Sequence, residues 1–254
     1  MSAAPSRPRR RAGRRARALA VVPAVLGLLG ACSALPPLPD PVPSSLEPSV
    51  AASLPADIGN LSPDGFDDAQ RMSVRIRNVG CGKLSTGSGF AIDDHTLVTN
   101  RHVVADSAGI QVSTYDGRDI ATEGTSTATL ADLALVRTAD ALPAASALAD
   151  ADPEPGTQIT VVGYPEGRAL SVTRGEVLDT VDDPLGENVG KVLVTNAQVE
   201  PGSSGSAVLD EDGRIVGVVY AKGDNGTSFV VPVSTLRAML DDEAGFAPAP
   251  TCSN

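Results

Sequence analysis

Short runs of β-branched and apolar residues recur along the chain from about Phe66 onward, and each run is bounded by Gly, Asp or Asn. Runs of this length between turn residues predict β-strands. Strands are predicted at Ser73–Val79, Gly89–Ile92, Thr96–Thr99, Ile110–Tyr115, Leu133–Arg137, Gln158–Gly163, Leu170–Leu178, Lys191–Thr195, Ser206–Leu209, Ile215–Tyr220 and Ser228–Val231. Many short strands with frequent turns indicate an all-β sandwich or barrel. One helix is predicted at Val233–Leu240, where Pro232 precedes the helix and Ser234 can cap it.

The N-terminal pattern differs from that of the rest of the chain. Seven arginines lie between Arg7 and Arg17, and an apolar run then extends from Ala18 to Ala31. A basic segment followed by a short apolar run is typical of a secretory signal, and this run is shorter than the roughly 20 residues of a spanning helix. Leu29-Gly30-Ala31-Cys32 resembles a bacterial lipobox, which predicts a signal peptide over 1–31 and a lipidated Cys32 that carries palmitate or a similar chain. A signal cut near Ala31 without lipidation and an uncut anchor are the alternatives.

Residues 32–66 are predicted to form a tether. Eight prolines lie between Ser33 and Pro63, mixed with Ser and Ala, and no period of a helix or strand is visible. Such composition is typical of a semi-extended linker. The predicted folded domain is 67–243, and an Ala/Pro-rich C-terminal tail follows at 244–254.

Charge narrows the possible partners. The 254 residues carry a net charge of −11. All 31 acidic residues but only 13 of the 20 basic residues follow Ala31, so removal of the signal leaves a net charge of −18. A domain this acidic should repel nucleic acid and anionic head-groups, so membrane contact would depend on lipid at Cys32. We expect no cofactor or metal, because no nucleotide or haem motif is apparent and only two histidines, His95 and His102, are present.

A serine lies between glycines in Gly202-Ser203-Ser204-Gly205-Ser206, directly before a predicted strand. Glycines allow a sharp turn, and the N–H groups of such a turn can converge on one point, as nucleophilic acyl transfer requires. The pattern alone is weak, because Gly/Ser turns are common on protein surfaces.

The order of residues strengthens this interpretation. Both histidines precede Ser204, which excludes the α/β-hydrolase order of Ser, Asp and His. His102 follows a predicted strand at a turn, where an imidazole can lie at the edge of a cleft. His95 lies in a predicted solvent-exposed hairpin turn and is not expected to be catalytic. Asp132 interrupts the apolar run Leu130–Val136, and a charge buried there is costly unless it is paired, for example with a histidine N–H. The subtilisin order needs an Asp well before the His, whereas Asp93 and Asp94 lie only a few residues before His102, in a predicted hairpin turn. The remaining order of His, Asp and Ser belongs to two-barrel serine proteases.

Four segments together resemble the trypsin-like serine proteases of the bacterial HtrA branch, and within that branch the membrane-tethered actinobacterial MarP type. They are Val98–Val104, Asp132–Leu135, Val162–Pro165 and Pro201–Val208. The resemblance covers roughly 71–240. It implies a chymotrypsin-like double barrel of two six-stranded antiparallel barrels with a short C-terminal helix, and hydrolysis of peptide bonds in polypeptide substrates. The expected location is outside the cytoplasm, attached to the cell membrane of an actinobacterium.

The resemblance also implies roles for individual residues. Ser204 would be the nucleophile, His102 the general base and Asp132 the residue that orients His102. The N–H groups of Gly202 and Ser204 would form the oxyanion hole. The strand at 218–221, with Val219, Tyr220 and Ala221, would pair with the substrate main chain. Gln198 would lie at the floor of the S1 pocket, where the absence of an acid argues against preference for Arg or Lys and favours a small or medium apolar residue.

The chain departs from the family pattern at two serines. Ser206 stands where a second glycine is usual, and Ser203 stands where pancreatic-type enzymes have an aspartate that captures a new N-terminus. That activation route is therefore not expected. HtrA enzymes usually carry a PDZ domain, and none is expected after Leu240.

Cys81 and Cys252 remain once Cys32 is assigned to lipid, and cysteines of an exported protein are expected to form a disulfide. The resemblance also points to a bond here. A structural role is favoured over a redox switch.

The main functional alternative is a binding or scaffolding lipoprotein that keeps the protease fold without turnover. An esterase on another fold is disfavoured by the order of the motifs.

Overall fold

A computed structural model describes residues 65–252. The predicted signal peptide, the lipidation of Cys32 and most of the predicted tether lie outside these residues. Within 65–252, none of the helices has the length and apolar character needed to cross a membrane.

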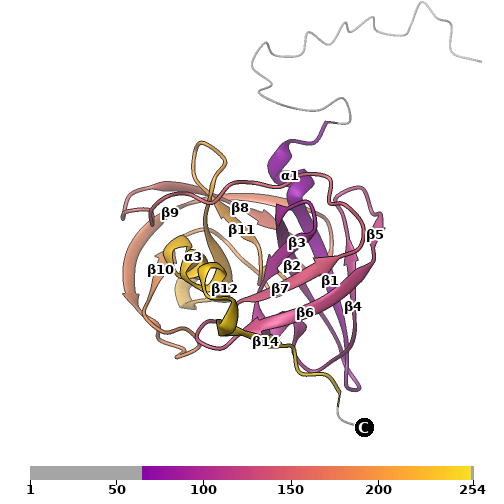
Figure 1. The fold of residues 1–254 in the computed structure, drawn as a ribbon. Helices are drawn as coiled ribbons and strands as arrows, with labels where there is room; N and C mark the ends of the chain where they lie inside the picture. Colours follow the sequence, from indigo (N-terminus) through magenta and orange to yellow (C-terminus); the bar gives the residue numbers. More distant parts are fainter. Residues whose placement is uncertain (1–64, 253–254) are drawn as a thin grey trace, which may run out of the picture. The chain divides into compact units, whose positions relative to one another are not determined.

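The first half of the described chain forms an eight-stranded sheet (Figure 1). Its elements are α1 (Asp68–Met72), β1 (Ser73–Gly80), β2 (Leu84–Asp93), β3 (Thr96–Thr99), α2 (Arg101–Val104), β4 (Ser107–Ser113), β5 (Asp119–Ile120), β6 (Thr122–Ala128) and β7 (Ala134–Thr138). The strand order is β14-β6-β7-β3-β2-β1-β4-β5, and all pairs are antiparallel. The eighth strand, β14 (Phe246–Pro248), comes from the C-terminal end of the chain.

The second half forms a closed barrel in the order β10-β13-β12-β11-β8-β9. Its elements are β8 (Gln158–Gly163), η2 (Pro165–Gly167), β9 (Ser171–Asp182), β10 (Lys191–Thr195), β11 (Ala207–Leu209), β12 (Ile215–Lys222), η3 (Asp224–Gly226) and β13 (Ser228–Pro232). Helix α3 (Val233–Asp241) packs on β12 and β13, and η4 (Glu243–Gly245) follows it (Figure 1).

All eleven predicted strands are present, and those at Thr96–Thr99, Gln158–Gly163 and Lys191–Thr195 have the predicted bounds. The prediction of two six-stranded barrels is confirmed only for the second half. In the first half, the structure has an eight-stranded sheet that includes the short β5 and the C-terminal β14.

The C-terminal segment lies between two strands of the first sheet. Ala249 N–H donates to Thr125 O on β6 (2.9 Å), and Ser107 N–H on β4 donates to Pro250 O (3.4 Å). Cys252 N–H then donates to Ser107 O at 3.2 Å. The segment predicted to be a C-terminal tail therefore links β6 to β4. These two strands lie near opposite ends of the sheet, on the side where a closed barrel would join them.

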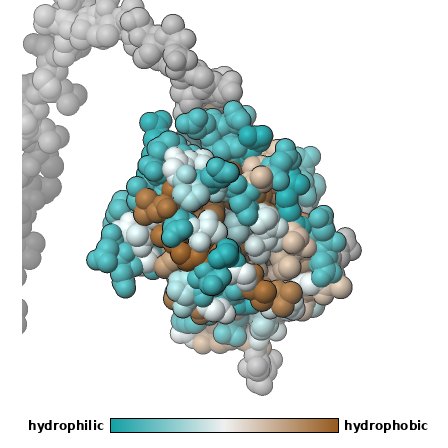
Figure 2. Space-filling view, turned by 90° about the vertical axis from the view of Figure 1, so that its left-hand side faces the viewer, coloured by the Kyte–Doolittle hydropathy of each residue, from teal (hydrophilic) through white to brown (hydrophobic). Residues whose placement is uncertain are grey.

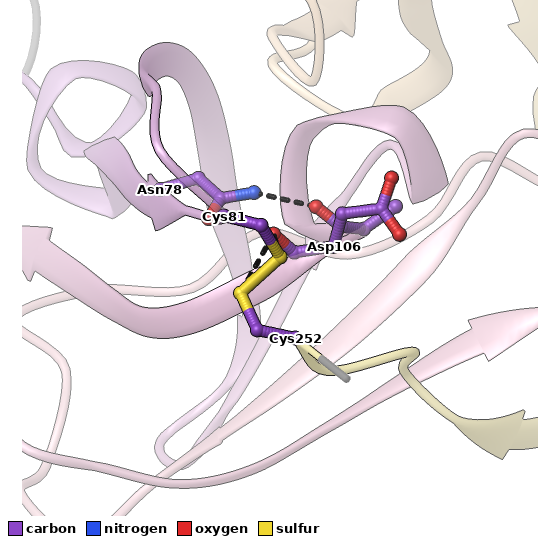
Figure 3. The surroundings of a disulfide bond; sticks show 5 residues. Asn78, Cys81, Asp106 and Cys252 are labelled. Carbon is purple, nitrogen blue, oxygen red and sulfur yellow. Dashed lines mark hydrogen bonds between the residues drawn. A yellow bond between two sulfur atoms is a disulfide. The ribbon is translucent and has the colours of Figure 1, made fainter. Parts of the chain in front are cut away.

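A disulfide joins Cys81 to Cys252 at the end of this segment (Figure 3). Both sulfur atoms lie near the main-chain oxygen of Asp106, and Cys81 N–H donates to that oxygen at 3.3 Å. Nearby, the buried amide of Asn78 donates to the oxygens of Val103 and Ala105 at 3.0 and 2.8 Å. The disulfide thus ties the C-terminal segment to the turn that follows helix α2, and α2 carries His102.

The core is built mainly from aliphatic side chains, as expected for a chain with 3% aromatic residues, and Phe90 is its largest fully buried side chain. One cluster fills the first sheet and extends between the halves, and a second cluster fills the closed barrel. The face drawn in Figure 2 is mostly hydrophilic, with small separated hydrophobic patches. This surface is consistent with the strongly acidic composition.

Helix α3 differs from the prediction at its N-terminus. Pro232 is the N-cap residue, so Ser234 does not cap the helix as predicted. Instead, Ser234 donates its N–H and its hydroxyl to the Asp152 carboxylate at 2.8 and 2.6 Å. A carboxylate at this end can satisfy a free N–H group and interacts favourably with the helix dipole.

Candidate active site

His102 and Asp132 form a hydrogen-bonded pair. His102 lies on the one-turn helix α2 that follows β3, and Asp132 lies two residues before β7, which pairs with β3. His102 Nδ1 is 2.6 Å from Asp132 Oδ2, and His102 main-chain N–H donates to Asp132 Oδ1 at 3.0 Å. The Asp132 side chain is 2% exposed and that of His102 49%. A buried carboxylate thus holds a half-exposed imidazole that can still meet a substrate.

Two asparagines hold the main chain of Asp132. Asn100 Nδ2 donates to Asp132 O at 2.7 Å, and Asn188 Oδ1 accepts Asp132 N–H at 2.9 Å. Both contacts are buried, where hydrogen bonds to main-chain groups are costly to lose. The aspartate is therefore fixed through its main chain as well as its side chain.

Ser204 lies in a loop between β10 and β11 that bends through left-handed glycines. Gly202 has φ +96° and Gly205 has φ +86°, values that favour glycine. A Cβ on Gly205 would lie 2.0 Å from Ser88 O. The glycines flanking the two central serines are therefore required by both backbone conformation and space.

The loop leaves two N–H groups free. Pro201 O accepts Glu166 N–H from η2 at 2.5 Å. Because a trans peptide points its N–H and C=O in opposite directions, Gly202 N–H points away from η2. Within residues 65–252, neither Gly202 N–H nor Ser204 N–H has an acceptor, whereas Ser203, Gly205 and Ser206 donate to Glu200 O, Val219 O and Ser203 O. Two free donors beside a serine can stabilise an oxyanion.

The Ser204 hydroxyl points to a bulge in β12. Ser204 Oγ donates to Tyr220 O at 3.5 Å, and in the described part of the chain it has no hydrogen bond to His102. The β12–β13 register shifts between Val219 and Ala221, so Tyr220 stands at an irregularity of the ladder. Bulges occur next to active sites because they redirect main-chain groups. Here the bulge leaves the Tyr220 carbonyl facing the serine.

Strand β2 connects the two halves of the site. Ser88 N–H donates to Ser204 O at 2.7 Å, and Thr99 Oγ1 donates to Ser88 O at 2.7 Å. A Cβ on Gly87 would lie 2.6 Å from the Val103 side chain and 3.2 Å from Ser204 O. Residues 87 and 88 thus contact both the serine loop and the segment that carries His102.

The predicted substrate-binding residues occupy different surroundings. Val219 already uses both main-chain groups, because its O accepts Gly205 N–H (2.8 Å) and its N–H donates to Ser206 O (3.0 Å). Tyr220 O and Ala221 remain beside the serine loop. Gln198 Nε2 donates to Gly226 O in η3 at 3.2 Å, and its side chain lines a cavity of about 180 Å³ together with Ser203 and Ser206. His95, by contrast, contacts Thr138 O through Nδ1 (3.0 Å).

The unusual Ser206 has a structural counterpart in Gly163. A Cβ on Gly163 would lie 1.8 Å from Ser206 Oγ, so the hydroxyl occupies space that a side chain at 163 would need. Ser203 Oγ accepts Glu200 N–H at 3.2 Å and so closes the loop internally. Both serines are thereby accommodated within the loop.

Asp183 in the β9–β10 loop and Tyr220 on β12 have shifted pKa values. Burial alone would raise the pKa of Asp183, but hydrogen bonds from Tyr220 OH and from Leu185 and Asn188 hold it below its ordinary value. Burial, and then the bond to Asp183, raise the pKa of Tyr220 far above its ordinary value. Because the folded pKa of Asp183 is lowered, its contribution to stability is present at neutral pH and is lost as the pH falls through that value. At neutral pH Tyr220 therefore donates and Asp183 accepts.

The sequence predicted none of the roles of Asn100, Asn188, Asp183 or Glu166. Asn100 directly precedes the helix of His102, which is the one local signal that could have identified it. Asn188 and Asp183 lie in a loop, where Asn and Asp are ordinary turn residues. Glu166 lies in η2 and contributes its main-chain N–H, which its side-chain type does not reveal.

Comparisons with known proteins indicate the family to which the chain is related. Residues 87–218 match the family described as "Trypsin-like peptidase domain". The chain is 29% identical over 196 residues to a probable periplasmic serine endoprotease DegP-like of Halomonas elongata, covering 74% of this chain and 41% of that protein. It is 28% identical over 235 residues to the serine protease Rv3671c of Mycobacterium tuberculosis, covering 87% of this chain and 58% of that protein.

A solved structure supports the same relationship. The active form of the Rv3671c protease from M. tuberculosis superposes with a TM-score of 0.65 at 26% identity, covering 73% of this chain and 87% of that one. The aligned regions span only 41%, 35% and 35% of the DegP-like proteins of Halomonas elongata and Marinomonas and the HtrA of Bacillus subtilis. These matches confirm the resemblance to HtrA-branch and MarP-type proteases.

Proposed function

Since the chain belongs to the trypsin-like peptidase family, we propose that it is a serine endopeptidase that cleaves polypeptides through an acyl-enzyme on Ser204. The observation that carries the proposal is the buried Asp132 paired to His102, next to a serine loop with two free N–H groups. Each part of this arrangement matches one requirement of acyl transfer: a base, an orienting acid, a nucleophile and an oxyanion site.

In the proposed mechanism, Asp132 accepts the Nδ1–H of His102 and leaves Nε2 unprotonated. Nε2 takes the hydroxyl proton as Ser204 Oγ bonds to the substrate carbonyl carbon, and then gives this proton to the leaving amine. Water attacks the resulting ester by the same route. Because Ser204 Oγ donates to Tyr220 O in the free protein, the hydroxyl must turn toward His102 when substrate binds. Catalytic hydrogen bonds often tighten only in the substrate complex.

Substrate would bind beside β12. Tyr220 O stands free of the ladder and can accept an N–H of an extended substrate, as in addition of a strand to a sheet edge. Gly202 N–H and Ser204 N–H would bind the oxyanion. Glu200 also lines the pocket near Gln198, but its carboxylate is paired with Lys222 at 2.8 Å. We therefore propose cleavage after small or medium apolar residues rather than after Arg or Lys.

Labelling with a fluorophosphonate tests this function. We expect the wild type to be labelled and to digest casein, and Ser204→Ala to do neither. Labelling of both proteins, or of neither, would contradict the assignment of Ser204. A peptide-library profile would then identify the preferred residue.

A second candidate is a protease-like binding protein without turnover, which the Ser204–Tyr220 hydrogen bond favours. In such a protein the serine would stay bound to the carbonyl and unreactive. This alternative would be supported if the wild type stayed unlabelled and if the wild type and Ser204→Ala bound peptides equally well.

We propose a location in the cell envelope, with Cys32 as a lipid anchor. A basic, apolar segment before Cys32 and a curated relative described as periplasmic support this location. Cys32→Ser is expected to move the protein from the detergent-extractable membrane fraction to the soluble exported fraction, because the acidic domain has little attraction for anionic lipid. Retention of Cys32→Ser in the membrane fraction would indicate an uncut signal anchor.

We propose a structural role for the Cys81–Cys252 disulfide. It closes a loop with a sequence separation of 171, for which the chain-entropy model gives about 5 kcal/mol. In a domain of this size, that stabilisation corresponds to about 10–20 °C in Tm. Cys252→Ser, or reduction of the wild type, is expected to lower Tm by about that amount in calorimetry. Specific activity at 25 °C should be unchanged, and a large change in rate without unfolding would instead indicate a redox switch.

A further inference from the structure

A chain of hydrogen bonds connects the β9–β10 loop to Asp132. Asn188 Oδ1 accepts Asp132 N–H at 2.9 Å, and Asn188 Nδ2 donates to Asp183 Oδ2 at 3.0 Å. Tyr220 OH donates to the other carboxylate oxygen of Asp183 at 2.6 Å. Asn188 is 8% exposed and Tyr220 3%, so water competes little for these bonds.

The chemistry of these groups sets the direction of every bond in the chain. A main-chain N–H requires an oxygen acceptor, and an ionised carboxylate can only accept. The Asn188 amide therefore satisfies both neighbours in one orientation only, with Oδ1 toward Asp132 and Nδ2 toward Asp183. The main-chain N–H of Asn188 also donates to Asp183 Oδ2 at 2.7 Å, so two hydrogen bonds to this oxygen hold Asn188 in place.

The loop is anchored to the Asp132 segment at further points. Val189 N–H donates to Leu130 O at 2.8 Å, and Glu187 forms an ion pair with Arg101 at 2.8 Å. Leu130 lies two residues before Asp132, and Arg101 directly precedes His102. A loop of the closed barrel thus contacts both segments that carry the His102–Asp132 pair on the first sheet.

We propose that Asn188, held by Asp183 and Tyr220, is a positioning residue that keeps the Asp132 carboxylate aligned with His102. The inference rests on the proposed function and extends it. Tyr220 contributes at both ends of the site, because its carbonyl faces Ser204 and its hydroxyl holds Asp183. Loss of the Asn188 amide leaves the Asp132 N–H buried without an acceptor. The segment that carries Asp132 must then shift to find a new acceptor. Even a small shift of a catalytic group lowers the reaction rate.

Asn188→Ala tests this role. We expect kcat on a peptide substrate to fall by about 10-fold or more while KM changes by less than about twofold, because the bond acts on the reacting groups and not on substrate binding. Tyr220→Phe should reproduce part of the loss, since it removes one donor to Asp183 and keeps the main-chain carbonyl.

Asn196→Ala is the matched control. Asn196 Oδ1 accepts Glu176 N–H at 2.7 Å, so this variant also loses an amide-to-main-chain bond between β9 and the segment after β10, but has no contact with Asp132. We expect Asn196→Ala to keep wild-type kcat. Wild-type kcat in Asn188→Ala, or equal losses in both variants, would overturn the proposal.

Proton NMR separates this inference from the proposed function. The proton shared by His102 Nδ1 and Asp132 should give a downfield resonance in the wild type and in Asn196→Ala, and lose or shift it in Asn188→Ala. This readout does not need turnover. A wild type without labelling or activity would reject the peptidase, while an unchanged resonance in Asn188→Ala would reject the positioning role.

Discussion

Replacing Asp132 by asparagine is expected to lower kcat on a peptide substrate by about 10⁴-fold with little change in KM. The reason lies in the two bonds that the carboxylate makes. His102 main-chain N–H donates to Oδ1, so in the variant this position must be the amide oxygen. The amide NH₂ then faces His102 Nδ1 and donates to it, which leaves the imidazole proton on Nε2. An Nε2–H cannot take the proton of Ser204, so the base is lost although the geometry is kept.

The control for Asp132→Asn is Asp119→Asn on β5 of the same sheet. Asp119 accepts the Ser113 hydroxyl at 2.9 Å and makes no contact with His102. We expect wild-type kcat and labelling rate for this control, and a Tm close to wild type for both variants, since asparagine keeps the shape of aspartate. An Asp132→Asn protein that retains more than about one tenth of the activity would show that Asp132 does not set the tautomer of His102.

The strands that sequence alone predicted are those with apolar side chains on at least one face. β8 and β10 were predicted to the residue because β-branched runs end sharply at Gly and Asn. β6 was missed because Thr122–Ala128 contains mostly Thr, Ser, Glu and Gly, and its pairing with β7 and β14 holds it in place instead. β14 was missed for the same reason: Phe246–Pro248 lies in an Ala/Pro-rich segment whose strand conformation depends on β6.

The candidate site was predictable where the sequence contains few residues of the required type. Only two histidines are present, and one aspartate interrupts an apolar run, so His102 and Asp132 could be selected without knowledge of the fold. Asn188 could not be selected in this way, because it lies 56 residues from Asp132 and looks like an ordinary turn residue. The packing of the β9–β10 loop against the segment before β7 brings its amide to Asp132.

Gly202→Ala is expected to lower kcat by about 10²–10³-fold, the usual cost of one lost oxyanion donor. Gly202 has φ +96°, and its Cβ would lie 2.8 Å from each of three main-chain atoms: Glu166 N, Gly167 N and Tyr164 O. Main-chain atoms of a turn cannot move aside as a flexible side chain can. The Pro201–Gly202 peptide must therefore rotate, which breaks the Glu166 N–H to Pro201 O bond and turns Gly202 N–H out of the oxyanion site.

Gly213→Ala separates this effect from the strain of a left-handed alanine. Gly213 has φ +76° in the turn between β11 and β12, and a Cβ there would meet nothing within 4 Å. Both variants should lose about 1 kcal/mol or more of stability for the backbone conformation, but only Gly202→Ala should lose kcat and fluorophosphonate labelling. If a folded Gly202→Ala protein stayed within about tenfold of wild-type kcat, Gly202 N–H would not be an oxyanion donor. The tight contact with η2 would then serve only to hold the loop.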